Sequence, residues 1–552
     1  MGKSRATLIV VAAAALAAAV GGVSVGSASD AARPSRLPAL PTKPMGAIDR
    51  ARVTAVVNEL LGRDQYKAEV PGLLIGIWSP TQGVYRAGFG QADLKTPARR
   101  PQPTDSFRIG SVSKTFTATV ILQLVDEGRL SLAGTVRRYA PALARRYPAI
   151  GSRTVAQLLG MRSGLPAYAD AAVKLQSRNP QRVWSANQLI ALGMRSGPVK
   201  PAGGASSVYT NTNYVILGQI AEAVTKTRFD RLVRERLLVP LSLRATTYPA
   251  PTDTRLPVPF TRGYVGPGGA EEIQKLGGTI EAGADVTRWN PSWGNAAGMM
   301  ISTIDDLARW ANGLAGNALL SPRLQRLRLT TTPMSDSLRY GLGILKLLPG
   351  ARWVGHEGGI PGWTTWALKD PKSGTVVVTS VNACCGGTPA SLTIDILAGL
   401  FPETFVVGPS LPGGKPYQLT ETTTITPPSG WTVDPDGTMK GEYLRAVKPG
   451  VVFSVGPLLF PEGQTFESWT TILHDSEARP GKIVSTLTPF TTTSGLEGST
   501  YTTRSAAEST LTWFVTNGPE IVRLDVRGSA SAVKAVTAEM TRMARSITMT
   551  AP

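Results

Sequence analysis

The sequence predicts an α/β domain with one central sheet and a helical insertion, followed by a small α+β domain. Strand-like runs lie near both ends of the first domain, and a largely helical stretch, continuing to about residue 244, separates them. This order indicates that both ends of the domain contribute to one sheet, with the helices inserted between them. The strand-like runs are residues 73–78, 83–88, 340–344, 363–366 and 375–381.

Two helices of this domain have clear start signals. Gly110 precedes an apolar run with helical spacing, which predicts a helix that begins at Ser111. Further along, Ser302 or Thr303 stands three residues before an acid. This is the arrangement of a capping box, and it predicts a helix through Trp310.

Residues 1–28 have the pattern of a secretory signal peptide. Lys3 and Arg5 form a basic start, an alanine-rich apolar run follows to about Val20, and small residues at 26–28 offer a cleavage site. An uncleaved membrane anchor is the alternative, although the run is short and alanine-rich for a membrane span. We therefore expect a protein that is secreted or associated with the cell wall.

With 552 residues, the chain is long enough for two or three folded units. Residues 29–48 are predicted to be a Pro/Ala-rich spacer, residues 49–405 the first domain, and residues 406–429 a linker. Residues 430–552 are predicted to form an accessory α+β domain. In it, apolar and charged residues alternate over 522–526 as in a half-buried strand, and apolar residues then recur at helical spacing.

Composition and charge limit the class of protein. Apolar residues make up 42% and charged residues 17% of the chain, which is typical of a globular protein. The 58 Lys and Arg against 38 Asp and Glu give a formal charge of +20. This charge favours contact with anionic wall polymers or lipid surfaces, or simply reflects an arginine-rich composition. No basic run with interleaved aromatic residues indicates nucleic acid.

The two cysteines, Cys384 and Cys385, are adjacent in the sequence, so a disulfide bond between them would be strained. We expect no metal site from them, and no cofactor.

The motif Ser111-Val-Ser-Lys114 gives the first indication of chemistry. A serine hydroxyl needs a nearby base to act as a nucleophile, and a lysine three residues along a helix lies on the same face. Backbone N–H groups at the helix start favour negative charge, and a dehydrated lysine can lose its proton. The chain has a second match, Ser531-Ala-Val-Lys534, on a predicted amphipathic helix, so this spacing alone does not identify a site.

Two further patterns follow in order along the chain. Tyr209-Thr-Asn211 precedes an apolar helix: a phenol beside a cation can relay protons and the amide can bind a substrate amide, but the tripeptide could equally cap the helix. His356-Glu-Gly-Gly359 holds one of only two histidines, and its glycines would let a strand approach a ligand closely. The N–H groups of Ser111 and Gly359 could form an oxyanion hole, although a glycine-rich turn is the simpler interpretation.

Together, the ordered motifs Ser-x-x-Lys, Tyr-x-Asn and His-x-Gly resemble the serine β-lactamase and penicillin-binding superfamily, in its class C-like branch. The separations of 98 residues (209 − 111) and 147 residues (356 − 209) suit that branch. The resemblance covers roughly residues 50–400, and the histidine of the third motif is most similar to secreted D-alanyl-D-alanine carboxypeptidases. It implies a β-lactamase-like fold, an antiparallel sheet flanked by helices with a helical insertion domain.

The resemblance also implies a role for each motif residue. Ser111 would attack a carbonyl while Lys114 and Tyr209 move its proton, and water would then release the acyl-enzyme. The histidine would replace a lysine near the substrate carboxylate and Tyr209. The substrate would be bound by residues of the second and third motifs: Asn211, His356, Gly358 and Gly359.

Departures from the family pattern leave the substrate open. Glu357 and Gly359 stand where the similar carboxypeptidases have threonine. Leu345 stands where they carry a basic group, and the next residue, Lys346, is an alternative source of that charge. An acid beside the site would oppose a substrate carboxylate unless it points away from the cleft. The first expectation is a D-alanyl-D-alanine carboxypeptidase acting on peptidoglycan-type peptides, with β-lactams as acylating ligands. An esterase or β-lactamase acting on another small acyl substrate, or a penicillin-binding sensor without turnover, are the alternatives.

Overall fold

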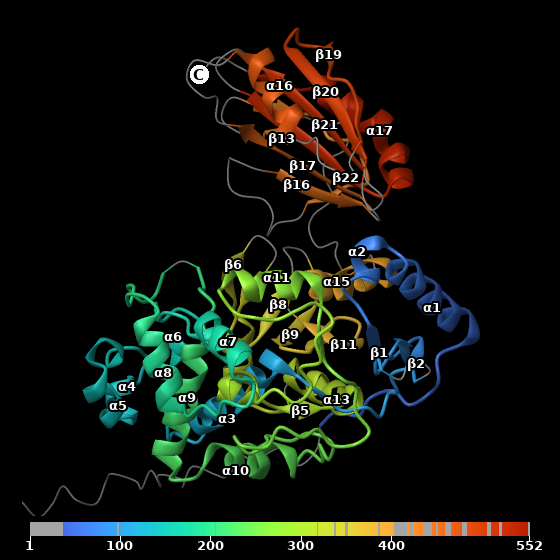
Figure 1. Ribbon diagram of the computed structural model, residues 1–552. Coiled ribbons are helices and arrows are strands. Elements are labelled where there is room, and N and C mark those ends of the chain that lie inside the picture. The colour runs from blue at the N-terminus through green and yellow to red at the C-terminus, as the bar shows by residue number, and fades with distance from the viewer. Residues whose placement is uncertain are drawn as a thin grey trace, which may run out of the picture.

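The computed structural model shows two units, each with its own sheet and helices (Figure 1). The predicted signal peptide, residues 1–28, lies outside the described part of the chain, as does most of the predicted linker. The described residues are 37–95, 99–204, 206–316, 318–335, 338–347, 351–384, 387–401, 404, 414, 417–418, 423–433, 444–448, 451–458, 465–476, 483–504, 509–517 and 521–549.

The larger unit is built on an antiparallel sheet with the strand order β2-β1-β11-β10-β9-β8-β7-β6. Strands from the two ends of the unit meet where β1 pairs with β11, which confirms the prediction of one sheet assembled from both ends. The strands are β1 (Gly72–Ser79), β2 (Gly83–Gly90), β6 (Thr332–Ser335), β7 (Leu338–Tyr340), β8 (Leu345–Leu347), β9 (Val354–Ile360), β10 (Trp363–Lys369) and β11 (Val376–Val381).

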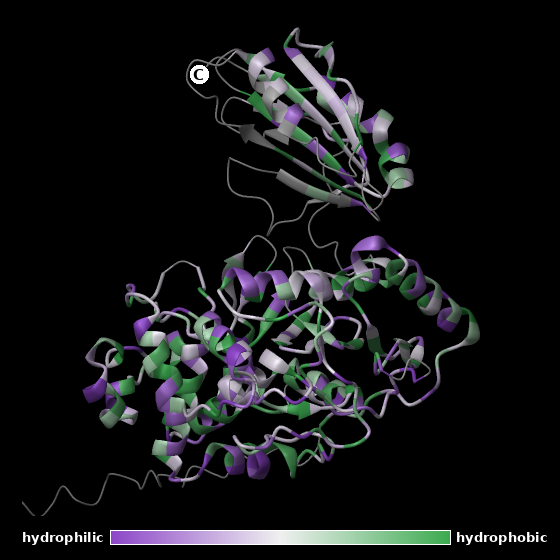
Figure 2. Cartoon of the chain, viewed as in Figure 1, coloured by the Kyte–Doolittle hydropathy of each residue, from purple (hydrophilic) through white to green (hydrophobic). Residues whose placement is uncertain are grey.

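Helices cover both faces of this sheet. On one face, Trp366 of β10 donates its Nε1–H to Ala390 O of α15 (Thr388–Leu400), and α1 (Ala47–Leu61) packs against α15. On the other face, α13 (Ile304–Leu314) packs against β1, β10 and β11. Every residue of β1 is therefore buried, which explains its continuous apolar run. Figure 2 shows purple, hydrophilic residues on α1 beside green, hydrophobic ones, as expected for a helix with one solvated side.

The helical insertion lies between β2 and β6, as predicted. Its centre is α3 (Ser113–Asp126) against α9 (Asn211–Thr225), and a stacked pair, Phe116 and Trp310, joins α3 to α13 with 3.8 Å between ring centroids. The other helices here are α4 (Val136–Tyr139), α5 (Pro141–Arg146), α6 (Val155–Leu159), α7 (Ala169–Arg178), α8 (Ala186–Arg195), α10 (Phe229–Val233), α11 (Pro267–Lys275), α12 (Asn295–Gly298) and α14 (Pro322–Leu329); α2 (Asp64–Lys67) precedes β1. Short pairs of strands join β3 (Phe107–Arg108) to β5 (Ile301–Ser302) and β4 (Tyr264–Val265) to β12 (Ala383–Cys384).

Two local predictions need correction. Residues 340–344 are predicted as a strand, but only Tyr340 is in one, as the last residue of β7. Residues 341–344 form the turn to β8, in which the Gly341 N–H donates to Ile344 O. The predicted capping box is only half formed. Thr303 caps α13 by accepting from the Asp306 N–H, but the Asp306 carboxylate instead accepts from the N–H of Ala245. Because these partners are distant in sequence, the local pattern did not reveal them.

The smaller unit is an α+β fold. Its antiparallel sheet has the order β15-β16-β17-β22-β21-β20-β18, with β19 beside β20, and α17 (Ala530–Arg545) packs on β21 and β22. The strands and second helix are β13 (Tyr417–Gln418), β14 (Thr423–Ile425), β15 (Thr432–Val433), β16 (Leu444–Lys448), β17 (Val451–Leu458), α16 (Phe466–Ser476), β18 (Ile483–Val484), β19 (Thr488–Thr491), β20 (Glu497–Arg504), β21 (Ser509–Thr516), β22 (Ile521–Gly528) and β23 (Thr548–Met549).

Both folded units extend beyond their predicted boundaries. Ile425 falls in the predicted linker, but it is fully buried in the core of the smaller unit. Met45 falls in the predicted spacer, but it is 3% exposed and belongs to the core of the larger unit. In β22 the apolar residues Val522, Leu524 and Val526 are buried, as the alternation predicts. On the other face Asp525 is also buried, and it accepts hydrogen bonds from Arg523 and Thr512. Within the described ranges, no helix has the length and apolar character needed to cross a bilayer.

Candidate active site

Ser111 lies in a tight turn at the start of a buried helix. The turn is a 3-10 segment, Gly110–Val112, so the α-helix itself begins two residues later than predicted. Gly110 has a φ of +49°, and a Cβ atom there would lie 2.8 Å from the carbonyl carbon of Gly358. Glycine is therefore required where this turn meets β9, and the close approach brings the Ser111 backbone to the third motif.

Lys114 lies one helical turn further on and points back to the serine. Its Nζ donates to Ser111 Oγ at 2.7 Å and to Ala297 O, in α12, at 2.8 Å. The lysine side chain is fully buried, while Ser111 is partly exposed. The structure therefore brings Lys114 next to Ser111, as predicted. The hydrogen bond from Lys114 to Ala297 O was not indicated by the sequence.

Burial lowers the pKa of Lys114 well below its usual value, and the negative charge of Glu357 opposes this effect. A neutral amine at 2.7 Å from a hydroxyl can accept its proton. The position of Lys114 and its lowered pKa are the properties that a general base for Ser111 would need.

Tyr209 lies over Lys114 at the mouth of the site. Lys114 Nζ is 4.8 Å from the centre of the phenol ring, and the Tyr209 hydroxyl shares a hydrogen bond with Ser111. The residue keeps 37% of its surface exposed. Burial of the hydroxyl raises the pKa of Tyr209 well above its usual value, and the bond with Ser111 opposes the rise. We expected a cationic Lys114 to lower this pKa, but burial has the larger effect, so the phenol stays protonated and can donate.

Asn211 is the first residue of α9, directly after the N-cap Thr210. Its Oδ1 is buried and has no hydrogen-bond partner among the described residues. A buried acceptor without a donor is costly, and an amide N–H of a substrate would satisfy it. This geometry supports the predicted role of Asn211 in binding a substrate amide.

His356 uses both ring nitrogens within the protein. Its Nδ1 lies 2.5 Å from Glu357 O, and its Nε2 lies 3.1 Å from the Tyr340 hydroxyl. Because a backbone oxygen can only accept, Nδ1 carries the proton, and Nε2 is the unprotonated nitrogen that faces the Tyr340 hydroxyl. Burial lowers the pKa of His356 to about 3, so the ring is neutral near neutral pH.

The aromatic group beside His356 was not identified as functional from the sequence. The Tyr340 ring contacts the rings of His356 and Tyr209 edge-on, with centroids 5.7 and 6.1 Å away, and its hydroxyl lies 3.3 Å from that of Tyr214. Tyr340 falls in a segment predicted as a strand, and the sequence assigned it no role of its own. Its place at the end of β7, beside the short strand β8 that leaves most of the β9 edge open, brings it into the site.

The backbone of the third motif lies directly against the turn of Ser111. β8 pairs with β9 only at the first two residues of β9, which leaves the rest of that edge without a strand partner in the described part of the chain. A Cβ atom on Gly358 would lie 1.9 Å from Ile109 O and 3.0 Å from Ser111 N. Only glycine fits there, and this contact supports an oxyanion hole formed by the N–H groups of Ser111 and Gly359.

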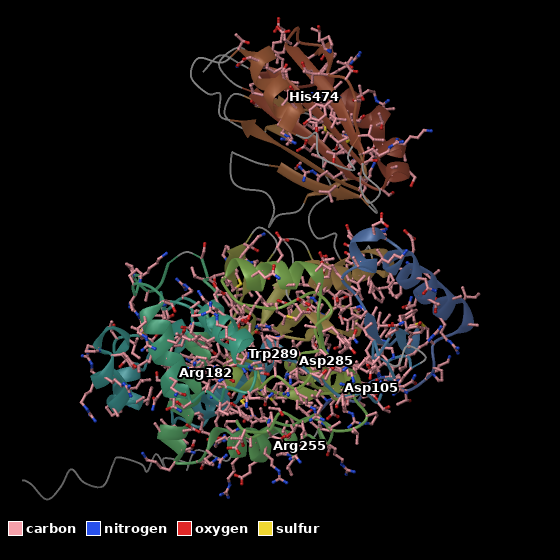
Figure 3. All side chains as sticks on the ribbon, viewed as in Figure 1. Asp105, Arg182, Arg255, Asp285, Trp289 and His474 are labelled. Carbon is pink, nitrogen blue, oxygen red and sulfur yellow. The ribbon has the colours of Figure 1, made fainter. Side chains whose placement is uncertain are left out.

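Several other features lie outside this site. Ser531 and Lys534 are exposed on α17, and His474 lies in α16 of the smaller unit (Figure 3). Cys384 is buried on β12, and Cys385 is outside the described residues. Among the described residues, no group of three His, Cys, Asp or Glu is placed to hold a metal ion.

Two curated relatives align with part of the chain. Protein flp of Staphylococcus aureus (strain MW2) is 27% identical over 193 residues, which cover 35% of this chain and 38% of flp. The D-alanyl-D-alanine-carboxypeptidase/endopeptidase AmpH of Escherichia coli (strain K12) is 24% identical over 226 residues, covering 41% of this chain and 57% of AmpH. The matched regions thus span less than two thirds of either relative.

A solved structure and a family model each match a larger share of this chain than these two relatives do. The D-stereospecific amidohydrolase from Streptomyces sp. is 30% identical with a TM-score of 0.54, and the match covers 64% of this chain and 99% of that protein. The family model described as Beta-lactamase matches residues 54–386, more than half of the chain. The chain therefore belongs to the β-lactamase family, within the serine β-lactamase and penicillin-binding superfamily of hydrolases.

Proposed function

We propose that the protein is a secreted serine hydrolase that cleaves amide bonds in peptides containing D-amino acids, through an acyl-enzyme on Ser111. The observation that carries the proposal is the 2.7 Å contact between Lys114 Nζ and Ser111 Oγ, beneath the ring of Tyr209. A lysine of lowered pKa in hydrogen-bond contact with a partly exposed serine is the arrangement that acyl transfer requires.

The proposed reaction begins when Lys114 takes the proton of Ser111 as Oγ bonds to the carbonyl carbon. The N–H groups of Ser111 and Gly359 stabilise the oxyanion. As the C–N bond breaks, Tyr209 gives its proton to the departing nitrogen and regains one from the Lys114 ammonium. Water then attacks the ester on Ser111, which releases the acid and restores the serine.

The first candidate activity is D-alanyl-D-alanine carboxypeptidase on cell-wall peptides. The His-x-Gly third motif and the similarity to AmpH support it. Penicillins resemble such peptides in the placement of the scissile amide, so we propose that β-lactams acylate Ser111 as well.

The second candidate activity is hydrolysis of D-amino-acid amides. It is favoured by the 30% identity to the Streptomyces amidohydrolase, which is matched over 99% of its length. The carboxylate of Glu357 at the site also favours a substrate without a free carboxylate beside the scissile bond.

Secretion to the cell wall is part of the proposal, supported by the signal-like residues 1–28 and the charge of +20. A surface hollow of about 470 Å³ in the helical insertion is lined by Arg146, Arg182 and Arg195 beside Trp184, and it offers a place for anionic wall polymers (Figure 3 labels Arg182).

The function is tested with a D-Ala-D-Ala peptide, a D-amino-acid amide, a nitrophenyl ester, a chromogenic cephalosporin and labelled penicillin. Wild type, Ser111→Ala and the control Ser531→Ala are compared. We expect release of D-alanine or ammonia by wild type and the control, and none by Ser111→Ala. Turnover of the ester or cephalosporin alone would replace the proposal with an esterase or β-lactamase. Labelling without any turnover would indicate a penicillin-binding sensor.

A further inference from the structure

Glu357 lies on the one face of β9 that reaches the solvent. Within β9, Glu357 is half-buried and Gly359 is exposed, while every other residue is buried. Because side chains alternate along a strand, residues 357 and 359 share one face, and His356 and Gly358 share the other. A Cβ atom on Gly359 would lie 3.6 Å from Glu357 Oε1, so the carboxylate extends along the strand toward the residue of the oxyanion hole.

This carboxylate has no ion-pair or hydrogen-bond partner among the described residues. It is close enough to the catalytic groups that its charge acts on both Lys114 and Tyr209. Its partial exposure and the approach of Oε1 to Gly359 place the carboxylate beside the residue of the proposed oxyanion hole. An acid that lies beside Gly359 and has no partner among the described residues remains available to a ligand.

The third motif supplies no positive charge to balance this acid. His356 is neutral, and its two ring nitrogens are occupied by Glu357 O and Tyr340. The adjoining position on β8, where the similar carboxypeptidases carry a basic group, is the buried Leu345, which pairs with Gly355 on the same face as Glu357. Lys346 pairs with Val354, so its side chain starts on the opposite face. On this face of β8 and β9 the protein therefore has the carboxylate of Glu357 and the apolar Leu345, where a carboxypeptidase would need a positive charge.

We propose that Glu357 determines the substrate class of the hydrolase by rejecting a free carboxylate beside the scissile amide and favouring a neutral or cationic leaving group. This inference rests on the proposed function. It favours the second candidate activity, on D-amino-acid amides, together with cleavage of internal peptide bonds, over the first, which is release of C-terminal D-alanine. A buried like-charge contact is strongly unfavourable, whereas an ammonium group would pair with the unpartnered carboxylate.

Three peptides that differ at one group test the inference: acyl-D-Ala-D-Ala, its C-terminal amide, and its 2-aminoethyl amide. For wild type we expect kcat/KM for either amide to exceed that for the acid by at least about tenfold. Glu357→Gln keeps the shape of the side chain and removes its charge, so this preference should fall by about tenfold, mainly through KM. Glu281→Gln, at an exposed position outside the site, should leave the preference unchanged.

Acylation by labelled penicillin and by its methyl ester gives a second readout, which needs no peptide turnover. Glu357→Gln should accelerate acylation by the free acid relative to the ester. Equal preferences in wild type and Glu357→Gln, in both the peptide and the penicillin series, would overturn the role of Glu357. Faster cleavage of the acid than of the amides by wild type would overturn it as well. If no peptide reacts but the penicillin ratio shifts, the proposed function fails and the role of Glu357 stands.

Discussion

His356 Nε2 lies 3.1 Å from the Tyr340 hydroxyl, while the other ring nitrogen lies 2.5 Å from Glu357 O. The histidine of the third motif therefore serves to hold the end of β7 and the start of the motif together. It has no nitrogen left for a substrate carboxylate, the role that the resemblance implied. Charge at this wall of the cleft comes from Glu357 instead.

The neutral state of His356 predicts a pH dependence of stability. Its pKa is about 3 in the folded protein and about 6.5 when unfolded, so the unfolded chain binds more protons between these values. The free energy of unfolding should therefore fall as pH decreases from 6.5 to 3, by up to about 1.4 kcal/mol per pH unit from this group. His356→Gln removes the titration. In urea unfolding at several pH values, the stability gap between wild type and variant should narrow as pH falls, and a constant gap would contradict this account.

Removing the nucleophile or its base should abolish acylation without unfolding the protein. Ser111→Ala should show no covalent labelling by penicillin, and Lys114→Met should label about 10²- to 10⁴-fold more slowly, since it removes the general base. Mass spectrometry and stopped-flow fluorescence measure the label and its rate. The matched controls Ser531→Ala and Lys534→Met, on the exposed face of α17, should react as wild type does.

The depressed pKa of Lys114 predicts the pH profile of acylation. Only the neutral amine accepts the serine proton, so the rate should rise with pH and level off well below the usual lysine pKa of 10.5. The Glu357 charge holds this pKa up, so Glu357→Gln should move the rising limb to lower pH. A rise centred near pH 10.5 would show that Lys114 is charged in the free enzyme.

Two adjacent glycines should respond in opposite ways to alanine. A Cβ atom on Gly358 would come within 1.9 Å of Ile109 O, so Gly358→Ala must displace the turn of Ser111 from β9. We expect it to lose activity and several degrees of Tm. At Gly359 the nearest atom to a Cβ would be 3.6 Å away, so Gly359→Ala should fold and acylate almost as wild type. Thermal unfolding and penicillin labelling compare the two, and equal effects would refute the packing argument.

Tyr209→Phe isolates the proton transfer of the phenol. The ring and its contacts with Tyr340 and His356 remain, so stability should change by less than about 0.5 kcal/mol. Loss of the hydroxyl should lower kcat about 10²-fold or more with little change in KM. A variant with normal kcat would assign the proton transfer to another group.

Much of the fold followed from local patterns in the sequence. The apolar run at 73–78 is a buried strand, and the spacing of Ser111 and Lys114 on one turn of a helix brings their side chains together. The contact between Ser111 and Lys114 depends on near neighbours in the chain, and a continuous apolar run is itself the pattern of a strand buried on both faces. The prediction of a strand at residues 341–344 was wrong. The hydrogen bond from the Gly341 N–H to Ile344 O closes a turn there, and no alternation of apolar and polar residues distinguishes this turn from a strand.

The sequence by itself determined which residues could do chemistry, their order along the chain and the helix that joins Ser111 to Lys114. It could not show that Lys114 is fully buried, that His356 is bonded to Tyr340, or that the unpartnered Glu357 carboxylate lies beside Gly359. Those properties arise where α3, α9, α12 and β9 pack together from distant parts of the chain. That packing sets how far each group is removed from water and how close the charges lie. Only the tertiary structure therefore decided the pKa values of Lys114 and His356 and placed the charge of Glu357 beside Gly359.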